Sequence, residues 1–441
     1  MAIREPVAIF CFRRDLRVED NAGLYHALQS GYRVLPVFIF DKNILDRLEN
    51  RHDRRVSFIH GALNALQEKL VAAGSSLEVI HDTPENAIRK LLSDFEIKAV
   101  FANHDYEPYA VARDRRIAEI LKESGILFRT FKDQVIFEKE EVLKSDRTPY
   151  TVFTPYASAW KKTVTEDQLR SYPSERLAGN FLRTEKQPLP SVADIGFAQT
   201  DYVFRAPEIN TEIIRNYHNT RDIPSLCGTT QLGVHLRFGT VSIRDLVRTG
   251  VLLNDVWLNE LIWREFFMSI LWHFPHVTDN SFKKKYDYIA WRNNEEEFER
   301  WCTGRTGYPI VDAGMRELNE TGFMHNRVRM ITASFLSKDL LIDWRWGEAY
   351  FAEKLLDYEL SSNNGNWQWA AGCGCDAAPY FRVFNPAEQT RKFDPDMLYV
   401  RKWVPELDTP EYPQPVVEHS YARDRALSAY KKALTDIALT K

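Results

Sequence analysis

Short apolar segments alternate with amphipathic segments near the beginning of the chain. Five segments are too short for helices and rich in apolar residues, and the first two are almost continuously apolar, which is typical of strands buried on both faces of a sheet. They span residues 6–13, 34–40, 77–80, 98–102 and 127–131. Helical spacing occurs from about residue 21 and over residues 63–72, 85–93 and 113–123. This alternation predicts a parallel, doubly wound sheet with helices on both faces.

The pattern changes twice further along the chain. Residues 132–205 carry scattered prolines and polar stretches, which is typical of a long connector, and one short helix is expected at 156–162. Beyond residue 206 nearly all apolar residues recur with helical spacing. The expected helices span residues 207–217, 242–249, 257–273, 295–302, 309–321, 326–340 and 347–357. We therefore expect an N-terminal α/β domain over residues 1–131, a linker over 132–205 and a larger all-α domain over 206–441.

Length and composition are those of an ordinary globular protein of two or three domains. The chain has 441 residues, of which 44% are hydrophobic and 27% are charged. Its five cysteines are scattered, so we expect no disulfide framework and a reducing compartment. Cys373 and Cys375 form a single Cys-x-Cys pair, which we interpret as thiols in the core and not as a metal site. No apolar run approaches a membrane span, and the first residues lack the apolar core of a signal peptide. We therefore expect a cytoplasmic protein without a membrane partner.

Tryptophan and charge change this picture. Ten of the 11 tryptophans lie at or after Trp257, and only Trp160 precedes them. The formal net charge of −4 does not by itself predict nucleic-acid binding, which depends on a local basic patch and not on the total charge. The C-terminal half is therefore organised around aromatic packing or aromatic chemistry.

One stretch, residues 356–369, combines carboxylates, amides and two tryptophans without any Lys or Arg. Amides and carboxylates can meet the hydrogen-bonding edge of a flat ring, and indoles can bound an apolar cavity. The stretch therefore suits a large, planar, polar-edged ligand. The alternative is a capped helix that Asn363, Asn364 and Gly365 interrupt, with the tryptophans in the core.

Two further helices carry candidate binding residues. Glu260, Trp263 and Arg264 share one helical face, where the indole can stack on a flat substrate and the charges can bind its edges or a phosphate. The alternative is a surface ion pair beside a core tryptophan. Asn326 and Met330 lie one turn apart and suit a flat base, or else belong to the core.

A glycine- and threonine-containing loop at residues 228–233 precedes a helix-like segment. Backbone N–H groups at such a helix start can bind a pyrophosphate. An ordinary turn is the alternative.

Together these segments resemble the photolyase/cryptochrome family, and most closely the bacterial class I cyclobutane pyrimidine dimer photolyases. The shared motifs occupy residues 12–17, 257–267, 306–313, 324–344 and 363–386. The resemblance implies an α/β antenna-type domain and a helical FAD-binding catalytic domain. It also implies light-driven repair of cyclobutane pyrimidine dimers, in which photoexcited reduced FAD passes an electron to a flipped-out dimer. The alternative is a cryptochrome-type blue-light photoreceptor that signals through flavin photoreduction.

The resemblance also implies roles for individual residues. Expected FAD contacts are Tyr217, Thr230, Gln231, Leu232, Trp257, Arg264, Asn326, Asp357, Glu359 and Asn363, with Asn363 facing flavin N5. The expected catalytic pocket for the dimer consists of Glu260, Trp263, Asn326, Met330 and Trp369. DNA contacts are expected from Arg221 and Arg327, together with Glu260, Trp263 and Trp369. The expected electron-transfer chain is Trp367, Trp344 and Trp291.

Three positions favour dimer repair over other branches of the family. Asn326 and Met330 stand where (6-4) photolyases place a histidine pair, and Trp369 stands where DASH-type cryptochromes usually have tyrosine. The expected partner is UV-damaged DNA, bound by a monomer in the bacterial cytosol. A second, light-harvesting chromophore is compatible with the family; methenyltetrahydrofolate, a deazaflavin and a flavin all stay open, and Glu107 is the candidate contact.

Overall fold

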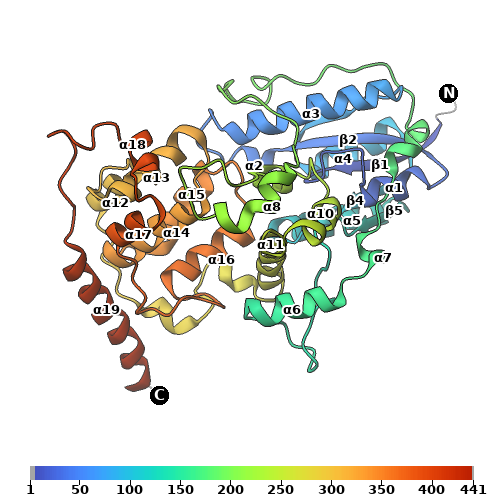
Figure 1. The fold of residues 1–441 in the computed structure, drawn as a ribbon. Helices are drawn as coiled ribbons and strands as arrows, with labels where there is room; N and C mark the ends of the chain where they lie inside the picture. Colours follow the sequence, from blue (N-terminus) through green and yellow to red (C-terminus); the bar gives the residue numbers. More distant parts are fainter. Residues whose placement is uncertain (1–4, 440–441) are drawn as a thin grey trace. The chain divides into compact units, whose positions relative to one another are not determined.

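The structure, a computed structural model, describes residues 5–439. Its contacts divide the chain into two compact units that interleave along the sequence (Figure 1). The first unit contains the chain up to Glu138, then Val164–Ile209 and Leu232–Thr249; the second contains Lys139–Thr163, Asn210–Gln231 and the chain from Gly250 onward. The domain boundaries expected at residues 131 and 205 stay a prediction. Each compact unit of the structure combines several separate stretches of the chain, so it does not correspond to one continuous domain.

The first unit contains a five-stranded sheet in the order β3-β2-β1-β4-β5. The strands are β1 (Pro6–Phe12), β2 (Arg33–Asp41), β3 (Glu78–Asp82), β4 (Glu96–Asn103) and β5 (Leu127–Phe131). All neighbouring pairs are parallel, and Ile9 of the central strand lies in register with both Leu35 and Val100. The predicted parallel, doubly wound sheet is thereby confirmed.

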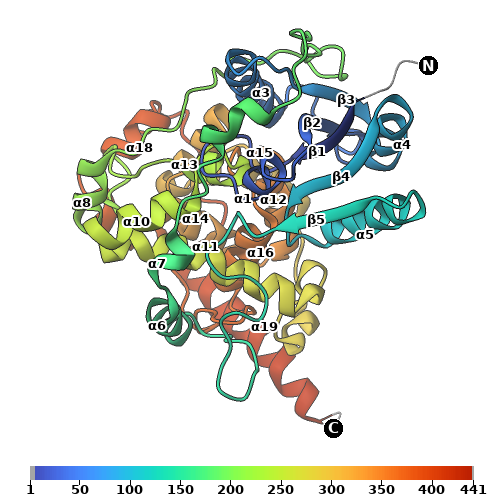
Figure 2. The ribbon, with the colours of Figure 1, turned by 90° about the vertical axis from the view of Figure 1, so that its right-hand side faces the viewer.

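Helices cover both faces of this sheet, as Figure 2 shows. They are α1 (Ala22–Leu28), α2 (Lys42–Leu45), α3 (Arg54–Ala72), α4 (Pro84–Asp94) and α5 (Pro108–Glu123). Alternate residues of β1 belong to different hydrophobic clusters: Phe10 packs with residues of α1 and α3, whereas Ile9 packs with residues of α4 and α5. This alternation follows from the two-residue period of a strand, and it explains why the strand is apolar throughout.

The first unit also includes α7 (Glu166–Leu169), a 3₁₀ turn (Ser174–Asn180) and α9 (Gly233–Phe238). A buried polar network joins Arg244, near the start of α10 (Ile243–Leu253), to the segments that follow β1 and β5. Arg244 donates to Asp20 Oδ1 at 2.9 Å and to Asp133 Oδ1 at 2.8 Å, and Arg17 donates to Asp133 Oδ2 at 2.7 Å. Both arginines and Asp133 are buried, so each charge has an opposite charge in contact, as burial requires.

Helices make up most of the second unit. They are α6 (Phe153–Thr163), α8 (Thr211–Thr220), α11 (Asp255–His273), α12 (Glu295–Cys302), α13 (Pro309–Thr321), α14 (Asn326–Ser334), α15 (Trp344–Lys354), α16 (Leu360–Ala371), α17 (Pro386–Phe393), α18 (Leu398–Trp403) and α19 (His419–Leu439). Two 3₁₀ turns, Pro275–Thr278 and Lys284–Tyr288, follow α11. The helix α10 (Ile243–Leu253), which precedes α11, begins in the first unit and ends in the second. The helix expected over residues 326–340 ends as a π-helical turn, Phe335–Asp339.

The helix α16 runs without interruption through the Asn-Asn-Gly sequence, so the interpretation that these residues break a helix is wrong. The reason is a close contact with α11. A Cβ atom on Gly365 would lie 2.2 Å from Cδ1 of Phe267, so glycine lets the two helices approach. Tertiary packing here outweighs the low helix propensity of Gly and Asn.

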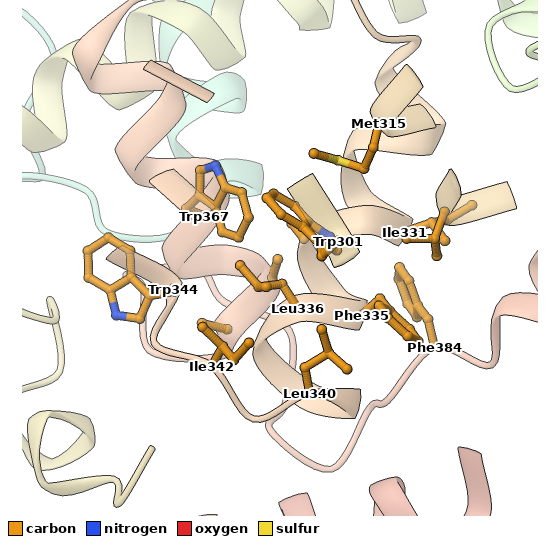
Figure 3. Close-up of a cluster of buried hydrophobic side chains, with 14 of the residues drawn as sticks. Trp301, Met315, Ile331, Phe335, Leu336, Leu340, Ile342, Trp344, Trp367 and Phe384 are labelled. Atoms are coloured by element: carbon orange, nitrogen blue, oxygen red, sulfur yellow. The ribbon is translucent and has the colours of Figure 1, made fainter. Parts of the chain in front are cut away.

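The core of the second unit is rich in aromatic side chains. Trp301, Trp344 and Trp367 are almost completely buried and belong to one cluster with Leu336 and Ile342, which Figure 3 shows. Trp367 contacts Trp301 at a ring-centroid distance of 6.1 Å and Phe351 at 5.0 Å. The concentration of tryptophan after Trp257 is thus matched by an aromatic core.

The described part of the chain lacks both a membrane-spanning helix and a cluster of metal-binding side chains. Within residues 5–439, no helix combines the length and the apolarity needed to cross a bilayer. In the same range, no three His, Cys, Asp or Glu side chains are grouped so that they could hold a metal ion.

Candidate functional site

The helix α11 presents the predicted charged face. Its N-cap, Asn254, accepts hydrogen bonds from the N–H groups of Val256 and Trp257 at 2.9 and 3.2 Å, which fixes where the helix begins. One turn later, the half-buried Glu260 forms an ion pair with Arg221, whose Nη1 lies 2.5 Å from Oε1 of Glu260. Burial raises the pKa of the Glu260 carboxyl, and the charge of Arg221 acts against that rise.

The contact between Glu260 and Arg221 belongs to a chain of alternating charges. Arg221 lies 3.8 Å from Asp222, measured from Nε to Oδ1, and Asp222 accepts from Nη2 of Arg327 at 2.7 Å. Arg327 in turn lies over the ring of Phe393, 4.4 Å from its centroid. The two arginines expected to contact DNA are therefore joined by Asp222, which the sequence did not single out despite its position next to Arg221.

Aromatic rings hold Trp263 in place. Phe153 of α6 stacks on its indole with centroids 3.7 Å apart and planes 5° from parallel, and Phe266 meets it edge-on at 5.6 Å. These contacts immobilise the indole by face-to-face stacking and edge-to-face packing. Phe153 was missed because it lies in the segment expected to be a linker, and no spacing along the sequence relates it to Trp263.

The helix α14 carries the other predicted pocket residues. Its N-cap is His325, whose Nδ1 accepts from the N–H of Arg327 at 3.2 Å. Burial and the nearby positive charge of Arg329 lower the pKa of His325 to about 4, so the imidazole is neutral near pH 7 and can act as the acceptor. Asn326 and Met330 follow one turn apart, and both are half-buried.

Two further ion pairs lie just before the start of α16. Arg264 donates to Oε1 of Glu359 at 3.0 Å; Glu359 is buried, and the Arg264 side chain is nearly so. Arg329 forms two hydrogen bonds to Asp357, at 3.1 and 2.9 Å. Arg264, Asp357 and Glu359 were expected at this site, whereas Arg329 was not.

The side chain of Asn363 has a defined orientation. Its Nδ2 donates to the backbone oxygen of Glu348 at 3.0 Å and to Oε1 of the same residue at 2.9 Å. The amide oxygen is therefore left as an acceptor. Burial raises the pKa of Glu348, and the hydrogen bond from Asn363 opposes this. Glu348 lies on α15, so only the packing of α15 on α16 identifies it.

The loop between α8 and α9 is closed by its own side chains. Thr220 Oγ1 donates to the backbone oxygen of Gly228 at 3.0 Å, and a Cβ atom at Gly228 would lie 2.5 Å from that of Thr220. Glycine is therefore required for this close approach. Thr230, two residues later, lies 3.4 Å from Nε1 of Trp257, which donates to its Oγ1.

The remaining predicted contacts in this region differ in exposure. Gln231 is exposed and adopts the left-handed conformation with φ of 51°. Tyr217 of α8 is buried, and burial together with the charge of Glu260 raises its pKa. Leu232 is buried and opens the segment that groups with the first unit.

The three tryptophans of the predicted electron-transfer chain differ in exposure. Trp367 and Trp344 are buried, and their Nε1 atoms have no hydrogen-bond partner in residues 5–439. Trp291 is half-buried and meets the ring of Tyr430 edge-on at 6.0 Å. Trp369, expected in the dimer pocket, lies two residues after Trp367 on α16 and is half-buried. The helix α16 packs on both α11 and α14.

Glu107, the candidate antenna contact, belongs to the first unit and follows β4. Its Oε1 accepts from Arg14 at 3.3 Å and also from Arg237. Asp105 accepts from the same Arg14 nitrogen at 3.1 Å. The carboxylate thus already has two guanidinium partners within its own unit, and its role towards a chromophore stays a prediction.

Comparison with known proteins supplies the family. A family model described as the FAD binding domain of DNA photolyase matches residues 257–411, and one described as DNA photolyase matches residues 8–174. The chain is 35% identical to the deoxyribodipyrimidine photo-lyase of Synechococcus sp., covering 98% of this chain and 97% of that protein. It is 36% identical to that of Escherichia coli, covering 96% and 98%.

Solved structures agree with this match. A class III photolyase from Agrobacterium tumefaciens has a TM-score of 0.87 at 31% identity, covering 98% of both chains. A photolyase from Sulfolobus tokodaii, solved with two FAD molecules, has a TM-score of 0.80 at 34% identity and covers 96% of this chain and 99% of its own. A cryptochrome from Synechocystis has a TM-score of 0.83 at 26% identity, covering 97% of this chain and 100% of its own.

The residues on α16 fit the FAD that the matching family model describes. Ser361 Oγ and Trp367 Nε1 are buried polar atoms without a partner in the described chain, and Asn363 between them keeps its amide oxygen as an acceptor. Such atoms suit a flat ligand with donor and acceptor edges. Both family models, the relatives matched over nearly their full length and these residues lead to one assignment. The chain belongs to the photolyase/cryptochrome family and carries its FAD-binding domain.

Proposed function

We propose that the residues around Glu260 carry out light-driven repair of cyclobutane pyrimidine dimers in UV-damaged DNA. The enzyme class is that of the curated relatives, deoxyribodipyrimidine photo-lyase. The observation that carries the residue-level proposal is the arrangement on α11. It brings a half-buried carboxyl, a stacked indole and a guanidinium to one helical face, where Glu260 contacts Arg221 and Trp263 stacks on Phe153.

FAD is the cofactor, and in its reduced, photoexcited state it supplies the electron that enters the dimer. The residues that would hold it are those at the start of α16. Asn363 would offer its amide oxygen to the flavin N5 edge, because its nitrogen is committed to Glu348. Arg264 and Asp357 would bound the ring, each held by its own ion-pair partner.

The dimer would bind against Trp263. Phe153 covers one face of the indole and prevents it from rotating, so the ring is preorganised for stacking on a flipped-out base. Met330 and Asn326 on α14 would add a polarisable thioether and an amide to the same pocket. Glu260 would donate a hydrogen bond to a pyrimidine carbonyl and so stabilise the negative charge that develops there.

The tryptophans Trp367, Trp344 and Trp291 would return the flavin to its reduced state. A tryptophan that loses an electron becomes a much stronger acid at its indole N–H. The buried Trp367 and Trp344 have no acceptor for the indole proton among the described residues, whereas Trp291 reaches the surface in part. The missing electron would therefore come to rest at Trp291, where loss of the indole proton to solvent leaves a neutral radical.

The partner of the chain is UV-damaged DNA. The phosphates of the damaged strand would be bound by Arg221 and Arg327, which supply charge without reading sequence. We further propose that one copy of the chain suffices, because all the pocket residues named here lie within one unit of one chain. A DNA substrate places the enzyme with the chromosome in the cytosol. A second chromophore is compatible with the family, and its identity is open.

The decisive experiment is a repair assay. Purified FAD-containing protein, reduced in the dark, is mixed with oligothymidylate containing a cyclobutane dimer and illuminated with blue light. We expect ultraviolet absorbance of the thymines to recover in light and not in darkness. Glu260→Ala should lower the yield per absorbed photon about tenfold, since hydrogen bonds involving charge are worth about 1.5–3 kcal/mol.

The matched control is Glu295→Ala, which removes an exposed carboxylate at the start of α12. It should leave the yield unchanged. Equal yields in wild-type and Glu260→Ala protein, with FAD bound in both, would remove Glu260 from the mechanism. Flavin photoreduction without any dimer splitting would instead support the photoreceptor function.

A further inference from the structure

The contact between Arg221 and Glu260 raises a question that the repair function alone does not answer. A carboxylate can only accept hydrogen bonds, and a pyrimidine carbonyl can also only accept them. An ionised Glu260 would therefore repel the carbonyl on which charge develops. Its ion pair with Arg221, at 2.5 Å, stabilises this ionised form.

The charged groups around Glu260 come from three parts of the second unit. Arg221, Asp222 and Tyr217 belong to α8 and the residues after it, and Arg327 approaches from α14. On α11 itself, Arg264 is engaged with Glu359. Arg221 is the one ion-pair partner found for Glu260 in residues 5–439. Burial raises the pKa of Glu260, Asp222 adds to the rise, and Arg221 and Arg327 oppose it.

Arg221 also has the properties of a phosphate ligand. About a quarter of its side chain is exposed, 26%, and its buried Nε has no hydrogen-bond partner in the described chain. A guanidinium binds a phosphate through paired N–H groups as well as it binds a carboxylate. Glu260 and a DNA phosphate therefore compete for the same side chain.

We propose that binding of dimer-containing DNA transfers Arg221 from Glu260 to a phosphate, and that Glu260 then takes up one proton from solvent. This inference rests on the proposed repair function. The proton adds to a carboxylate oxygen and gives a neutral carboxylic acid, whose O–H donates to the pyrimidine carbonyl. Arg221 acts as a positioning residue, because it sets the protonation state of Glu260.

The physical basis is the loss of a countercharge in an enclosed site. Without Arg221, the carboxylate keeps its burial and the nearby negative charge of Asp222, and both favour the protonated form. The bound DNA also removes water from the pocket. Arg327 is paired with Asp222 at 2.7 Å and is itself a proposed phosphate ligand, so it is less free to replace Arg221 at Glu260.

Proton uptake is measured by calorimetric titration of a dimer-containing oligonucleotide into FAD-loaded protein, in the dark and near neutral pH. The titration is run in phosphate and in Tris buffer, whose ionisation enthalpies differ. We expect uptake of about one proton per complex. Glu260→Gln, which keeps the shape of the side chain, should bind the same oligonucleotide with uptake close to zero.

Two further variants sharpen the test. Glu295→Gln on α12 should keep the uptake of the wild-type protein. Arg221→Met should reduce the uptake, because Glu260 in the free variant lacks its partner and is already partly protonated. Binding of the dimer without any dependence on buffer would overturn the inference, and so would full uptake in Glu260→Gln.

Illumination of the same samples separates this inference from the repair function. Light-dependent dimer splitting without proton uptake would overturn the proton coupling alone. If the protein neither binds the dimer in preference to undamaged DNA nor splits it, the proposed function fails and the inference fails with it.

Discussion

Two groups of ion pairs in the second unit differ in how deeply they are buried. Around Glu260, the side chains of Arg221, Asp222 and Glu260 keep 26%, 40% and 35% of their surface exposed. At the start of α16, the side chains of Arg264 and Glu359 keep only 11% and 6%. The exposed charges can exchange partners with a DNA phosphate, whereas the buried pair cannot separate without leaving a desolvated charge.

The helix α11 supplies one member to each group. Glu260 and Arg264 are one turn apart on the same face, yet Glu260 contacts Arg221 and Arg264 contacts Glu359. In the proposed function, a single helical face would therefore serve two purposes: one end would meet the damaged DNA, and the other would help to fix the cofactor-binding residues.

The largest expected effect comes from breaking the buried pair. Arg264→Met removes the guanidinium that contacts Glu359 and should lower the free energy of unfolding by about 3–5 kcal/mol. Urea unfolding followed by circular dichroism measures this change, and the flavin absorbance of the purified variant shows how much FAD is retained.

Arg221→Met is the matched comparison, since it makes the same substitution in the exposed pair. It should cost less than about 1 kcal/mol. Equal losses in the two variants would contradict the distinction between a fixed and an exchangeable ion pair.

The tryptophans extend the same contrast between buried and exposed groups. Trp291→Phe removes the half-buried last member of the proposed tryptophan series. It should slow photoreduction of oxidised FAD more than about tenfold, which corresponds to an increase of about 1.4 kcal/mol in the activation barrier. Repair by protein reduced in advance should be unaffected. Absorbance changes of the flavin under blue light measure the first effect, and the dimer assay measures the second.

Trp403→Phe is the control, because Trp403 is also half-buried and packs against the same aromatic core. It should leave photoreduction as in the wild-type protein. Retained photoreduction in Trp291→Phe would show that electrons enter by another route.

The smallest effect concerns the exposed arginine and DNA. Arg221→Ala should weaken binding of dimer-containing DNA and reduce the slope of log K against log salt by about one. Binding is measured by fluorescence anisotropy at several salt concentrations. Arg423→Ala, on α19, removes a similarly paired surface arginine and should leave the slope unchanged. An unchanged slope in Arg221→Ala would place the phosphate contact elsewhere.

Much of the architecture could be predicted from local patterns. The five strand-like segments became the five parallel strands, and the central strands β1 and β2 are apolar almost throughout because both of their faces are covered. The shared face of Glu260, Trp263 and Arg264 followed from the helical period alone. The tryptophan-rich C-terminal half predicted an aromatic core, which Trp301, Trp344 and Trp367 form.

Other features depended on packing between distant residues. Nothing in the spacing of Asn363, Asn364 and Gly365 predicts that the helix continues through them, since the reason is the contact between Gly365 and Phe267. The later helices α17, α18 and α19 were also not predicted from the sequence.

The sequence by itself determined which residue types were present on each helix and strand, and through them the family, the cofactor and the class of reaction. Tertiary structure alone decided which partner each residue has: Arg221 for Glu260, Phe153 for Trp263 and Glu348 for Asn363. The physical reason is how far apart along the chain the interacting residues lie. Helical and strand periods act between neighbours along the chain, whereas ion pairs, stacking and amide orientation are set by groups that only folding brings into contact.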